Sequence, residues 1–451
     1  MTAADFAVQL GTRVALVEKD RLGGDCTWTG CVPSKTLLKA AKVAHQMRTA
    51  GRYGLPTDPF TVDLAQVMSH VRSVIDEIYE EEDPKALREK GIDVFLSAAR
   101  FTGPHTIAVG DDQLAASHVL IATGARPFLP PIDGIDTINA LTSDTIWALD
   151  QLPEHLVVVG AGPVGCEMAQ AFRRLGTRVT LLSSHDQILP RDDPAAAQVL
   201  ARVFATEGVD VRLNARAERV WKDEDGIHVI AGGDDIVGDR LFFATGRRPN
   251  VDGLGLDSAG VDYTAQGIEV DNHLRTSQHH IYAAGDCLGG YQFTHYAGWQ
   301  AFVAVRNALL PGASTGITNR VPWTTFTDPE VAQVGLTETQ AREQRGDDVM
   351  TCQRQMAQSD RARTEHATDG FVKLVHKSDG TLLGATIVAE RAGEMLHEWI
   401  VALENDLKIG DVADLIHVYP TYATANQLVA AAIRVEQVLN NPLVRLARKV
   451  L

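Results

Sequence analysis

The chain has 451 residues, of which 45% are hydrophobic, so it can form a large core and about two to four domains. Its formal net charge of −16 and its pI of about 5.4 argue against nucleic acid and anionic membranes as partners. No apolar run approaches the ~18 residues that cross a bilayer, and no secretory signal pattern is present, so we expect a cytoplasmic protein.

The first residues predict the second half of a dinucleotide-binding unit. Residues 3–10 indicate a helix capped by Gly11, and residues 13–17 indicate a buried strand that ends at Glu18. An acid at the end of such a strand binds a ribose hydroxyl. The strand and the Gly-x-Gly-x-x-Gly turn expected before it are missing from the sequence. Either the start was assigned about 20 residues too late or the pyrophosphate cradle has been lost, and we favour the late start.

Cys26 and Cys31 form a close pair, and the second cysteine leads into a predicted helix over residues 34–50. Pro33 suits the first helical position, which places Cys31 beside a helix N-terminus. Unpaired amides there favour negative charge and lower the pKa of a thiol, and Lys35 adds a positive charge. The pattern indicates a redox disulfide held against a flat ligand; the alternative is two buried, unreactive thiols. The other three cysteines are expected to be unpaired, and no residue cluster has the spacing of a metal site.

The stretch from Gly23 to Lys35 resembles the redox motif of the pyridine nucleotide-disulfide oxidoreductases, which include dihydrolipoamide dehydrogenase, glutathione reductase and mercuric reductase. Trp28 stands where Asn is usual. The resemblance implies a homodimeric FAD enzyme in which NAD(P)H supplies electrons through the flavin to the Cys26–Cys31 disulfide. It also implies that Cys31 is the thiolate near the flavin and that Cys26 exchanges with the acceptor.

Further along the chain, residues 63–90 predict one long helix, and residues 94–96 and 106–109 predict short strands. A strand beginning at His118 runs into Ala-Thr-Gly, and the resemblance places Thr123 and Gly124 beside the adenosine side of the flavin cofactor.

Residues 156–183 form a strand, a glycine turn, a helix and a second strand. Gly160, Gly162 and Gly165 complete Gly-x-Gly-x-x-Gly in its full βαβ setting, which is a strong signal for a dinucleotide pyrophosphate at the helix N-terminus. Ser183 and Ser184 stand where an acid would favour NAD, so we favour NADPH over NADH. The alternative for these serines is a solvated loop.

The resemblance assigns further cofactor contacts. Glu167, just inside the helix of the second unit, is implied to pair with Lys35 beside the reactive nitrogen of the flavin. A second Ala-Thr-Gly ends at Gly246 and echoes the first, which implies two similar nucleotide-binding domains. Asp286 follows a strand and is implied to bond the ribityl chain, and the segment ending at Ala297 is implied to line the flavin.

These elements predict an α/β protein with two Rossmann-like domains, for FAD and NAD(P), and a C-terminal α+β dimerisation domain, with the first βα unit of the FAD domain missing. Strands at 371–375 and 382–388 and helices at 393–405 and 423–439 build the last domain. The predicted boundaries are 1–145 and 251–318 for the FAD-binding domain, 146–250 for the NAD(P)-binding domain and 319–451 for the dimerisation domain.

The acid–base position departs from the family. Where thiol-using members have His-x-His-Pro-Thr-x-x-Glu, this chain has Tyr419 for the second His and Thr424 for the Glu. A tyrosine with a pKa near 10 shuttles protons poorly at neutral pH. His417 could substitute as the base, or it is an ordinary loop histidine.

The resulting hypothesis is a mercuric reductase-like enzyme with a thiophilic or small-molecule acceptor, without the C-terminal cysteine pair of that branch. The alternatives are a dihydrolipoamide dehydrogenase or related disulfide reductase, and a flavin-free nucleotide-binding remnant. The sequence leaves the acceptor and the choice between NADH and NADPH open.

Overall fold

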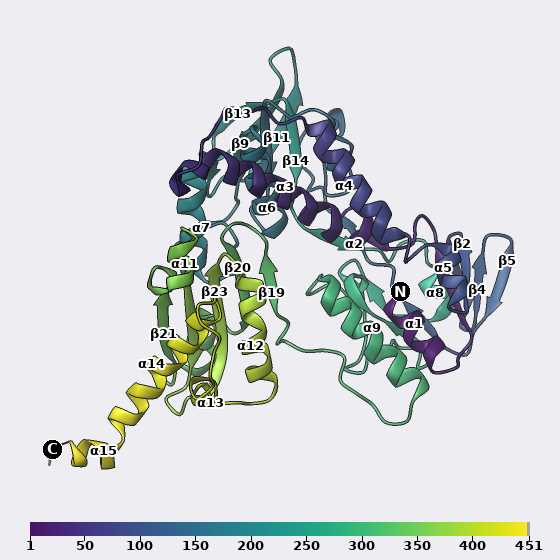
Figure 1. Ribbon diagram of the computed structural model, residues 1–451. Helices are drawn as coiled ribbons and strands as arrows, with labels where there is room; N and C mark the ends of the chain where they lie inside the picture. Colours follow the sequence, from purple (N-terminus) through teal and green to yellow (C-terminus); the bar gives the residue numbers. More distant parts are fainter. Residues whose placement is uncertain (449–451) are drawn as a thin grey trace. The chain divides into compact units, whose positions relative to one another are not determined.

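The computed structural model describes residues 1–448, which fall into two compact units (Figure 1). The first unit contains residues 1–40, 60–152 and 241–319, and the second contains residues 41–59, 153–240 and those from 320 onward. Among the residues described, no helix is long and apolar enough to cross a membrane. The fold is of the mixed α/β class that the sequence predicts, whereas the four predicted domain segments stay predictions.

The first unit combines short parallel strand pairs with helices. Its elements are α1 (Thr2–Gln9), β1 (Val14–Glu18), α2 (Gly24–Trp28), the first half of α3 (Cys31–Thr49), α4 (Leu64–Tyr79), α5 (Pro84–Glu89), β2 (Ile92–Leu96), β3 (Ala99–Gly103), β4 (Thr106–Val109), β5 (Asp112–Ala115), β6 (Val119–Ile121), β7 (Ala125–Pro127), β15 (Arg247–Pro249), α8 (Leu256–Ala259), β16 (Tyr263–Thr264), β17 (Gly267–Ile268), β18 (Ile281–Ala283) and α9 (Thr294–Leu309). Strand β1 pairs in parallel with β2, and β6 pairs in parallel with β18, as two separate sheets. Strands β3 to β5 form an antiparallel sheet.

Three expectations for this unit were wrong in detail. The helix predicted over 63–90 is two helices, because Asp83 caps a new helix whose first residue is Pro84. Helix α3 begins at Cys31, so Pro33 is its third residue; the amides of the first turn have no intrahelical partner, so proline is tolerated there too. Strand β1 is half-exposed and not buried, since it pairs with β2 alone.

The second unit begins with the predicted βαβ motif. Its elements are β8 (His155–Val159), α6 (Pro163–Leu175), β9 (Arg178–Leu182), α7 (Pro194–Glu207), β10 (Asp210–Arg212), β11 (Ala217–Lys222), β12 (Ile227–Ala231) and β13 (Asp234–Gly238), and β14 (Arg240–Phe243) follows where the chain leaves this unit. Strands β8, β9 and β10 are parallel, and every residue of β8 is buried, as expected for a strand covered on both faces.

The C-terminal part of this unit is a five-stranded antiparallel sheet in the order β19-β20-β23-β22-β21. The elements are β19 (Trp323–Thr325), β20 (Glu330–Gly335), α10 (Glu338–Arg345), β21 (Met350–Gln355), α11 (Asp360–Thr364), β22 (Phe371–His376), β23 (Leu382–Ala389), α12 (Ala392–Glu404), α13 (Ile409–Ala413), α14 (Thr424–Asn440) and α15 (Pro442–Ala447). Helices α12 and α14 pack on this sheet (Figure 1) and bury Trp399 completely in its core. The predicted strands and helices of this part are confirmed.

Candidate active site

The structure brings the two predicted redox cysteines together. Cys26 lies in α2, Cys31 opens α3, and both are half-buried free thiols; Cys31 is the largest influence on the pKa of Cys26, so the two side chains lie close together. Gly30 makes the turn between the helices possible, because a Cβ at this position would come within 2.8 Å of the carbonyl oxygen of Asp25. The pair is therefore placed for reversible dithiol chemistry at a helix N-terminus.

The surroundings of the two sulfurs differ. The Oγ1 atom of Thr294, the first residue of α9, lies 3.3 Å from the Sγ of Cys31. The pKa of the Cys26 thiol is raised, first by its hydrogen bond to Cys31 and then by burial, while Thr294 opposes the shift. Negative charge is thus disfavoured on Cys26. Sequence reasoning missed Thr294, which is 263 positions from Cys31; its place at the start of a helix shortly after Asp286 was the available signal.

Trp28, the departure from the usual motif, anchors the redox helix. Its Nε1 donates to the carbonyl of Leu22 at 2.6 Å, the Arg21 guanidinium lies 4.2 Å above its ring, and Tyr79 of α4 packs edge-on at 4.9 Å. Because aromatic and cation–π contacts of this kind stabilise packing, Trp28 fixes α2 against α4. In the structure, the role of Trp28 is therefore to pack α2 against its protein neighbours.

Arg247 links the redox motif to the Gly-Asp turn. Its guanidinium donates to the Asp25 carboxylate and to the carbonyl of Ala125, and its Nε lies 3.6 Å from Oδ2 of Asp286. Burial raises the pKa of the Asp286 carboxyl, and the charge of Arg247 opposes that shift. Sequence reasoning assigned no role to Arg247, although this residue directly follows the second Ala-Thr-Gly.

Three glycines of the first unit leave open space beside the backbone, which the close approach of a flat cofactor requires. Gly24, Gly124 and Gly246 all have positive φ, and a Cβ added to any of them would meet no atom within 4 Å. Glu18 ends β1 as predicted, and its Oε1 accepts from the amide of Asp20 at 2.8 Å. These residues fit a flavin dinucleotide, although the glycine-rich turn for its pyrophosphate is not among the residues described.

The other residues that are predicted to lie near the flavin also belong to this unit. The Thr123 hydroxyl donates to the carbonyl of Asn250 at 2.7 Å. Gly285, just before Asp286, allows the close approach of α9, since a Cβ there would lie 2.9 Å from Cβ of Ala297. Their contact with a cofactor stays a prediction.

The glycine turn of the second unit is also open. Gly160 has φ 108°, and Gly162 caps α6 without a side-chain hydrogen bond and with open space beside its Cα. Gly165 is buried within the first turn of α6, where the helix packs on its neighbours. The geometry fits a dinucleotide pyrophosphate at the N-terminus of α6.

Ser183 and Ser184 follow β9 in different settings. The Ser183 hydroxyl is buried, donates to the carbonyl of Gln187 at 2.9 Å and accepts from the amide of His185 at 3.1 Å, so it shapes the loop. Ser184, the next residue, is exposed, so of the two serines it is the one that could contact the ribose of a dinucleotide.

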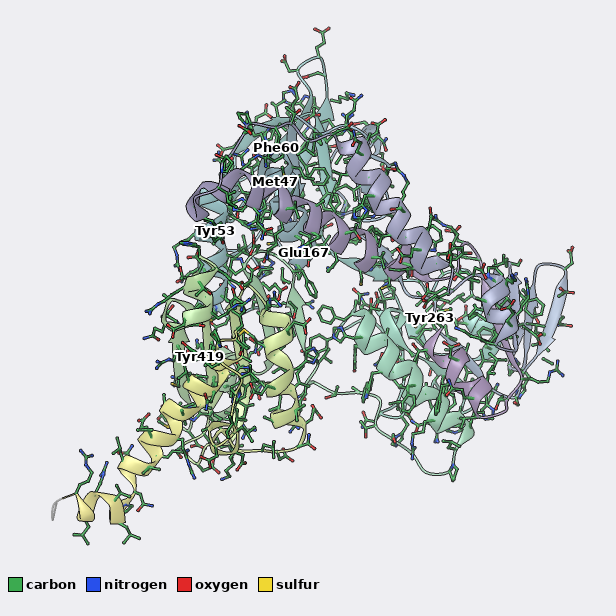
Figure 2. All side chains as sticks on the ribbon, viewed as in Figure 1. Met47, Tyr53, Phe60, Glu167, Tyr263 and Tyr419 are labelled. Atoms are coloured by element: carbon green, nitrogen blue, oxygen red, sulfur yellow. The ribbon has the colours of Figure 1, made fainter. Side chains whose placement is uncertain are left out.

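Glu167 is buried on α6 (Figure 2), and its Oε1 accepts from the backbone amide of Phe326 at 2.9 Å. Gln170, one turn on, accepts from the amide of Asp328 at 2.8 Å and donates to its carbonyl at 2.8 Å. Glu167 thus helps to fix the chain ahead of β20. The Lys35–Glu167 pair would join the two units and stays a prediction.

A buried ion-pair network continues from this face of α6. Arg174 bonds Glu207 at 2.5 Å and Asp328 at 2.6 Å, and Lys42 bonds Asp328 at 3.3 Å and Glu390 at 2.6 Å. Although burial opposes the effect, the charges of Arg174 and Lys42 hold the pKa of the Asp328 carboxyl well below its usual range. The network ties α6 and the second half of α3 to the C-terminal sheet.

The predicted acid–base residues are held by other side chains. The Nε2 of His417 lies 2.6 Å from Oε1 of Glu398, and only 9% of the His417 side chain is exposed. Tyr419 is 67% exposed (Figure 2), and its hydroxyl donates to Asp360 at 2.8 Å, which raises the pKa of the tyrosine further above its usual value. A part for either side chain in proton transfer stays a prediction.

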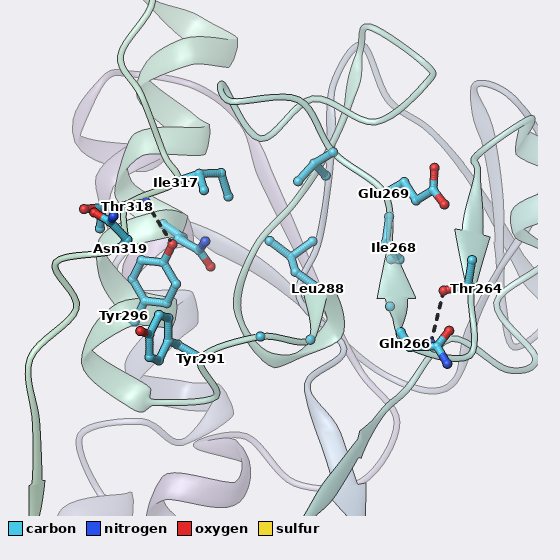
Figure 3. Close-up of a pocket in the computed structure, with 15 residues that line it drawn as sticks. Thr264, Gln266, Ile268, Glu269, Leu288, Tyr291, Tyr296, Ile317, Thr318 and Asn319 are labelled. Atoms are coloured by element: carbon cyan, nitrogen blue, oxygen red, sulfur yellow. Dashed lines mark hydrogen bonds between the residues drawn. The ribbon is translucent and has the colours of Figure 1, made fainter. Parts of the chain in front are cut away.

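An open pocket of about 950 Å³ lies in the first unit, beyond the Asp286 turn (Figure 3). Tyr291 and Tyr296 line one side, Ile268 and Leu288 another, and the amide of Thr318 donates to the Tyr296 hydroxyl at 3.3 Å. Neither cysteine of the redox pair lines this pocket.

The second unit contains a group of possible metal-ligand atoms from Asp223, Asp225 and His228. His228, however, is already hydrogen-bonded to Asp223 and to Asp235, at 3.0 Å each. His228 therefore has both ring nitrogens occupied, and the absence of a metal site stays a prediction.

Comparison with known proteins matches both parts of this architecture. Residues 1–301 match the family described as pyridine nucleotide-disulphide oxidoreductase, and residues 321–430 match the dimerisation domain of that family. The chain is 34% identical to a mercuric reductase of Bacillus cereus, over 95% of this chain and 68% of the relative, and 35% identical to a dihydrolipoyl dehydrogenase of Geobacillus stearothermophilus, over 93% and 90%. It is also similar to the solved structure of the HOCl-induced flavoprotein disulfide reductase RclA from Escherichia coli, with a TM-score of 0.85 and 28% identity over 95% of this chain and 96% of that one.

Proposed function

This chain belongs to the pyridine nucleotide-disulphide oxidoreductases, and we propose that it reduces a thiophilic or small-molecule acceptor through Cys26 and Cys31 in the manner of mercuric reductase. Members of this family bind FAD and use NAD(P)H, and the family makes this chain an NAD(P)H-dependent oxidoreductase. The observation that carries the proposal is the pair of free cysteines on adjoining helices, Cys26 in α2 and Cys31 at the N-terminus of α3.

The bound flavin would supply two-electron chemistry between nicotinamide and sulfur. Open backbones at Gly24, Gly124 and Gly246 would admit it, and Asp286 with Arg247 would hold its ribityl side. The amides at the start of α3 stabilise a thiolate on Cys31, and the Thr294 hydroxyl beside that sulfur can donate to it. Cys26 is then the exchanging thiol.

The nicotinamide dinucleotide would bind at the N-terminus of α6, over Gly160 and Gly162. We propose NADPH as the preferred donor, because no acidic side chain follows β9 at Ser183 and Ser184 to repel a 2′-phosphate. Introducing an acid with Ser184→Glu should shift the preference toward NADH.

The acceptor side supports a substrate that needs no strong base. A thiol substrate must lose its proton during exchange, and Tyr419, with its pKa raised by Asp360, takes that proton poorly. A thiophilic metal ion or a small disulfide-free acceptor avoids this step. The second candidate, a dihydrolipoamide dehydrogenase or related disulfide reductase, is favoured by the 35% identity to a dihydrolipoyl dehydrogenase.

The match of residues 321–430 to the family's dimerisation domain supports a homodimer. Apolar side chains lie exposed along the end of this part, including Val435 and Val438 of α14 and Leu443 and Leu446 of α15. We propose that a second copy covers them.

The test is the visible spectrum of the purified protein, followed by titration with NADPH and NADH. A yellow protein whose reduced form shows a long-wavelength thiolate-to-flavin band supports the proposal, and Cys31→Ser should abolish that band. Turnover with mercuric ion and with oxidised lipoamide then separates the two candidates. Colourless protein that FAD cannot reconstitute supports the flavin-free remnant, and turnover that survives serine at both cysteines excludes the proposed route.

A further inference from the structure

The loop that follows β9 ends in two adjacent buried acids, Asp192 and Asp193. It runs from Ser183 to the start of α7, and only 6% of Asp192 and 1% of Asp193 are exposed. Oδ1 of Asp192 accepts from the indole Nε1 of Trp323, in β19, at 2.8 Å. Oδ2 of Asp193 accepts from Nζ of Lys373, in β22, at 2.8 Å. The end of the loop is thus fastened to two strands of the C-terminal sheet, and all of these residues belong to the second unit.

The same loop is bonded to the glycine turn ahead of α6. The amide of Leu189 donates at 2.8 Å to the carbonyl of Ala161, in the middle of that turn. Leu189 is completely buried and has φ 47°, a left-handed conformation that a leucine keeps only where its surroundings impose it. The amide of Asp192 donates to the carbonyl of Leu189 at 2.9 Å, which joins the contact with the glycine turn to the contact with Trp323.

Side chains within the loop hold its two ends together. Nε2 of Gln187 donates to the carbonyl of Leu189 at 3.3 Å and to that of Asp192 at 3.4 Å, and the carbonyl of Gln187 accepts from the Ser183 hydroxyl. The exposed Ser184 follows directly at the start of the loop. The position expected at the ribose and the turn expected at the pyrophosphate are therefore connected to one anchor, the Asp192–Trp323 bond.

The anchor is a bond to a buried carboxyl group. Burial raises the pKa of the Asp192 carboxyl to about 6, the bond from Trp323 opposes this shift, Asp193 adds to it and Arg191 opposes it. At neutral pH the indole thus donates to a charged acceptor, and such hydrogen bonds are stronger than neutral ones. Replacing Trp323 would leave a buried carboxylate without this donor, which costs more than the bond itself contributes.

We propose that Asp192 is a positioning residue for the nicotinamide dinucleotide: its bond with Trp323 fixes the loop after β9 on the C-terminal sheet, and the loop fixes the glycine turn through Leu189. Helix α6 adjoins β19, and α7 adjoins β23 of the same sheet (Figure 1). The inference rests on the proposed dinucleotide site at the N-terminus of α6. It adds to that site a residue that lies 131 positions beyond Asp192 and outside the glycine motif.

The test is the dissociation constant of NADP⁺ and of NAD⁺, measured by titration calorimetry on the full-length protein as purified, in its oxidised state. Trp323→Phe and Asp192→Leu should each raise it about 10-fold, within the range of effects carried through packed contacts. Asp192→Asn should stay near the wild-type value, because its amide oxygen can still accept from the indole. The peptide that contains the Leu189 amide should exchange its hydrogens faster in Trp323→Phe, since that amide bonds the glycine turn.

The matched control is Trp221→Phe. The indole Nε1 of Trp221 also donates to a carboxylate of the second unit, Oδ2 of Asp223 at 3.3 Å, but it lies in β11. This variant should bind both dinucleotides as the wild type does. The visible spectrum of every variant should also match that of the wild type, because the substitutions lie outside the residues that are predicted to lie near the flavin.

An affinity in Trp323→Phe equal to that of Trp221→Phe would overturn the proposal, as would an Asp192→Asn variant that binds as weakly as Asp192→Leu. If Trp323→Phe and Asp192→Leu do not fold, Gln187→Ala serves instead and should raise the dissociation constant about 3-fold through loss of weak hydrogen bonds; no increase overturns the proposal. A wild-type protein that binds neither dinucleotide also overturns it. The calorimetry needs no acceptor and no cysteine chemistry, whereas failure of the proposed function appears in the thiolate-to-flavin band and in turnover, so the two failures are distinguishable.

Discussion

Arg174 gives the sharpest prediction about stability. Its guanidinium is 5% exposed and bonds two carboxylates, Glu207 at 8% and Asp328 at 22% exposure. Arg174→Met removes the cation and leaves both acids without it, and removal of one partner of a buried pair costs ~3–5 kcal/mol. Because Asp328 keeps Lys42 and Glu207 keeps a bond from Gln170, we expect the lower end, about 3 kcal/mol.

The assay is native-state hydrogen exchange on peptides that cover α6 and β20, which reports the second unit alone. A loss of about 3 kcal/mol raises the exchange rate roughly 100-fold, since each 1.4 kcal/mol is a factor of ten. The control is Arg212→Met, whose pair with Asp210 is about half exposed at 47% and 46% and should contribute less than about 1 kcal/mol. The double variant Arg174→Met/Asp328→Asn should lose less than the sum of the single changes. Equal exchange in the two Arg→Met variants would refute the reasoning.

Three further predictions concern other parts of the chain. Burial raises the pKa of Glu330 from 4.5 to about 7, so its contribution to stability is full below pH 4.5 and is lost as the pH rises through about 7. Glu330→Gln should reduce the loss of unfolding free energy between pH 5 and pH 8, by at most about 3 kcal/mol, as measured by urea unfolding at the two pH values. A difference between the two pH values that equals that of the wild type would contradict this prediction. Trp28→Asn, which restores the family's usual residue, should destabilise α2 by about 2–4 kcal/mol because the packing on Tyr79 is lost. Hydrogen exchange in α2 should then be faster than in the wild type. An unchanged exchange rate would show that this packing contributes little. Gly285→Ala should lower the FAD content of purified protein, because its Cβ would meet Ala297 at 2.9 Å with φ at 82°, and full flavin occupancy would argue against this cradle.

The βαβ motif of the second unit was predictable because all its signals are local. Apolar runs set β8 and β9, and the glycines between them permit only a tight turn before α6. The helix break at Pro84 was missed because the apolar pattern continues on both sides, although Asp83-Pro84 is a helix-start signal. Local pattern therefore identifies elements well and their interruptions poorly.

The site was predictable where the motif is contiguous and not where the fold brings distant residues together. Cys26 and Cys31 follow from one contiguous motif, Gly23 to Lys35, and not from their spacing alone. Thr294 and Arg247 reach the same place from more than 200 positions away. No periodicity in the sequence encodes such contacts, because they depend on how helices and strands pack.

Two departures from the family motif, at Tyr419 and Thr424, fall on the acceptor side of the proposed electron path. The glycine turn at the start of α6 and the carboxylate at Asp286 are of the usual types, whereas Tyr419 and Thr424 replace the usual His and Glu. Electron entry depends on cofactors that all members share, so its residues have little freedom to differ. Electron exit depends on the acceptor, and here the chain offers a tyrosine held by Asp360 in place of a base. We therefore infer that the acceptor takes electrons from Cys26 without a proton transfer to or from the protein, which suits a soft metal ion and does not suit a disulfide, whose product thiols take up protons. Tyr419→His tests this directly: a large gain in lipoamide turnover would show that the missing base alone excludes thiols, and no gain would show that the acceptor pocket excludes them by shape.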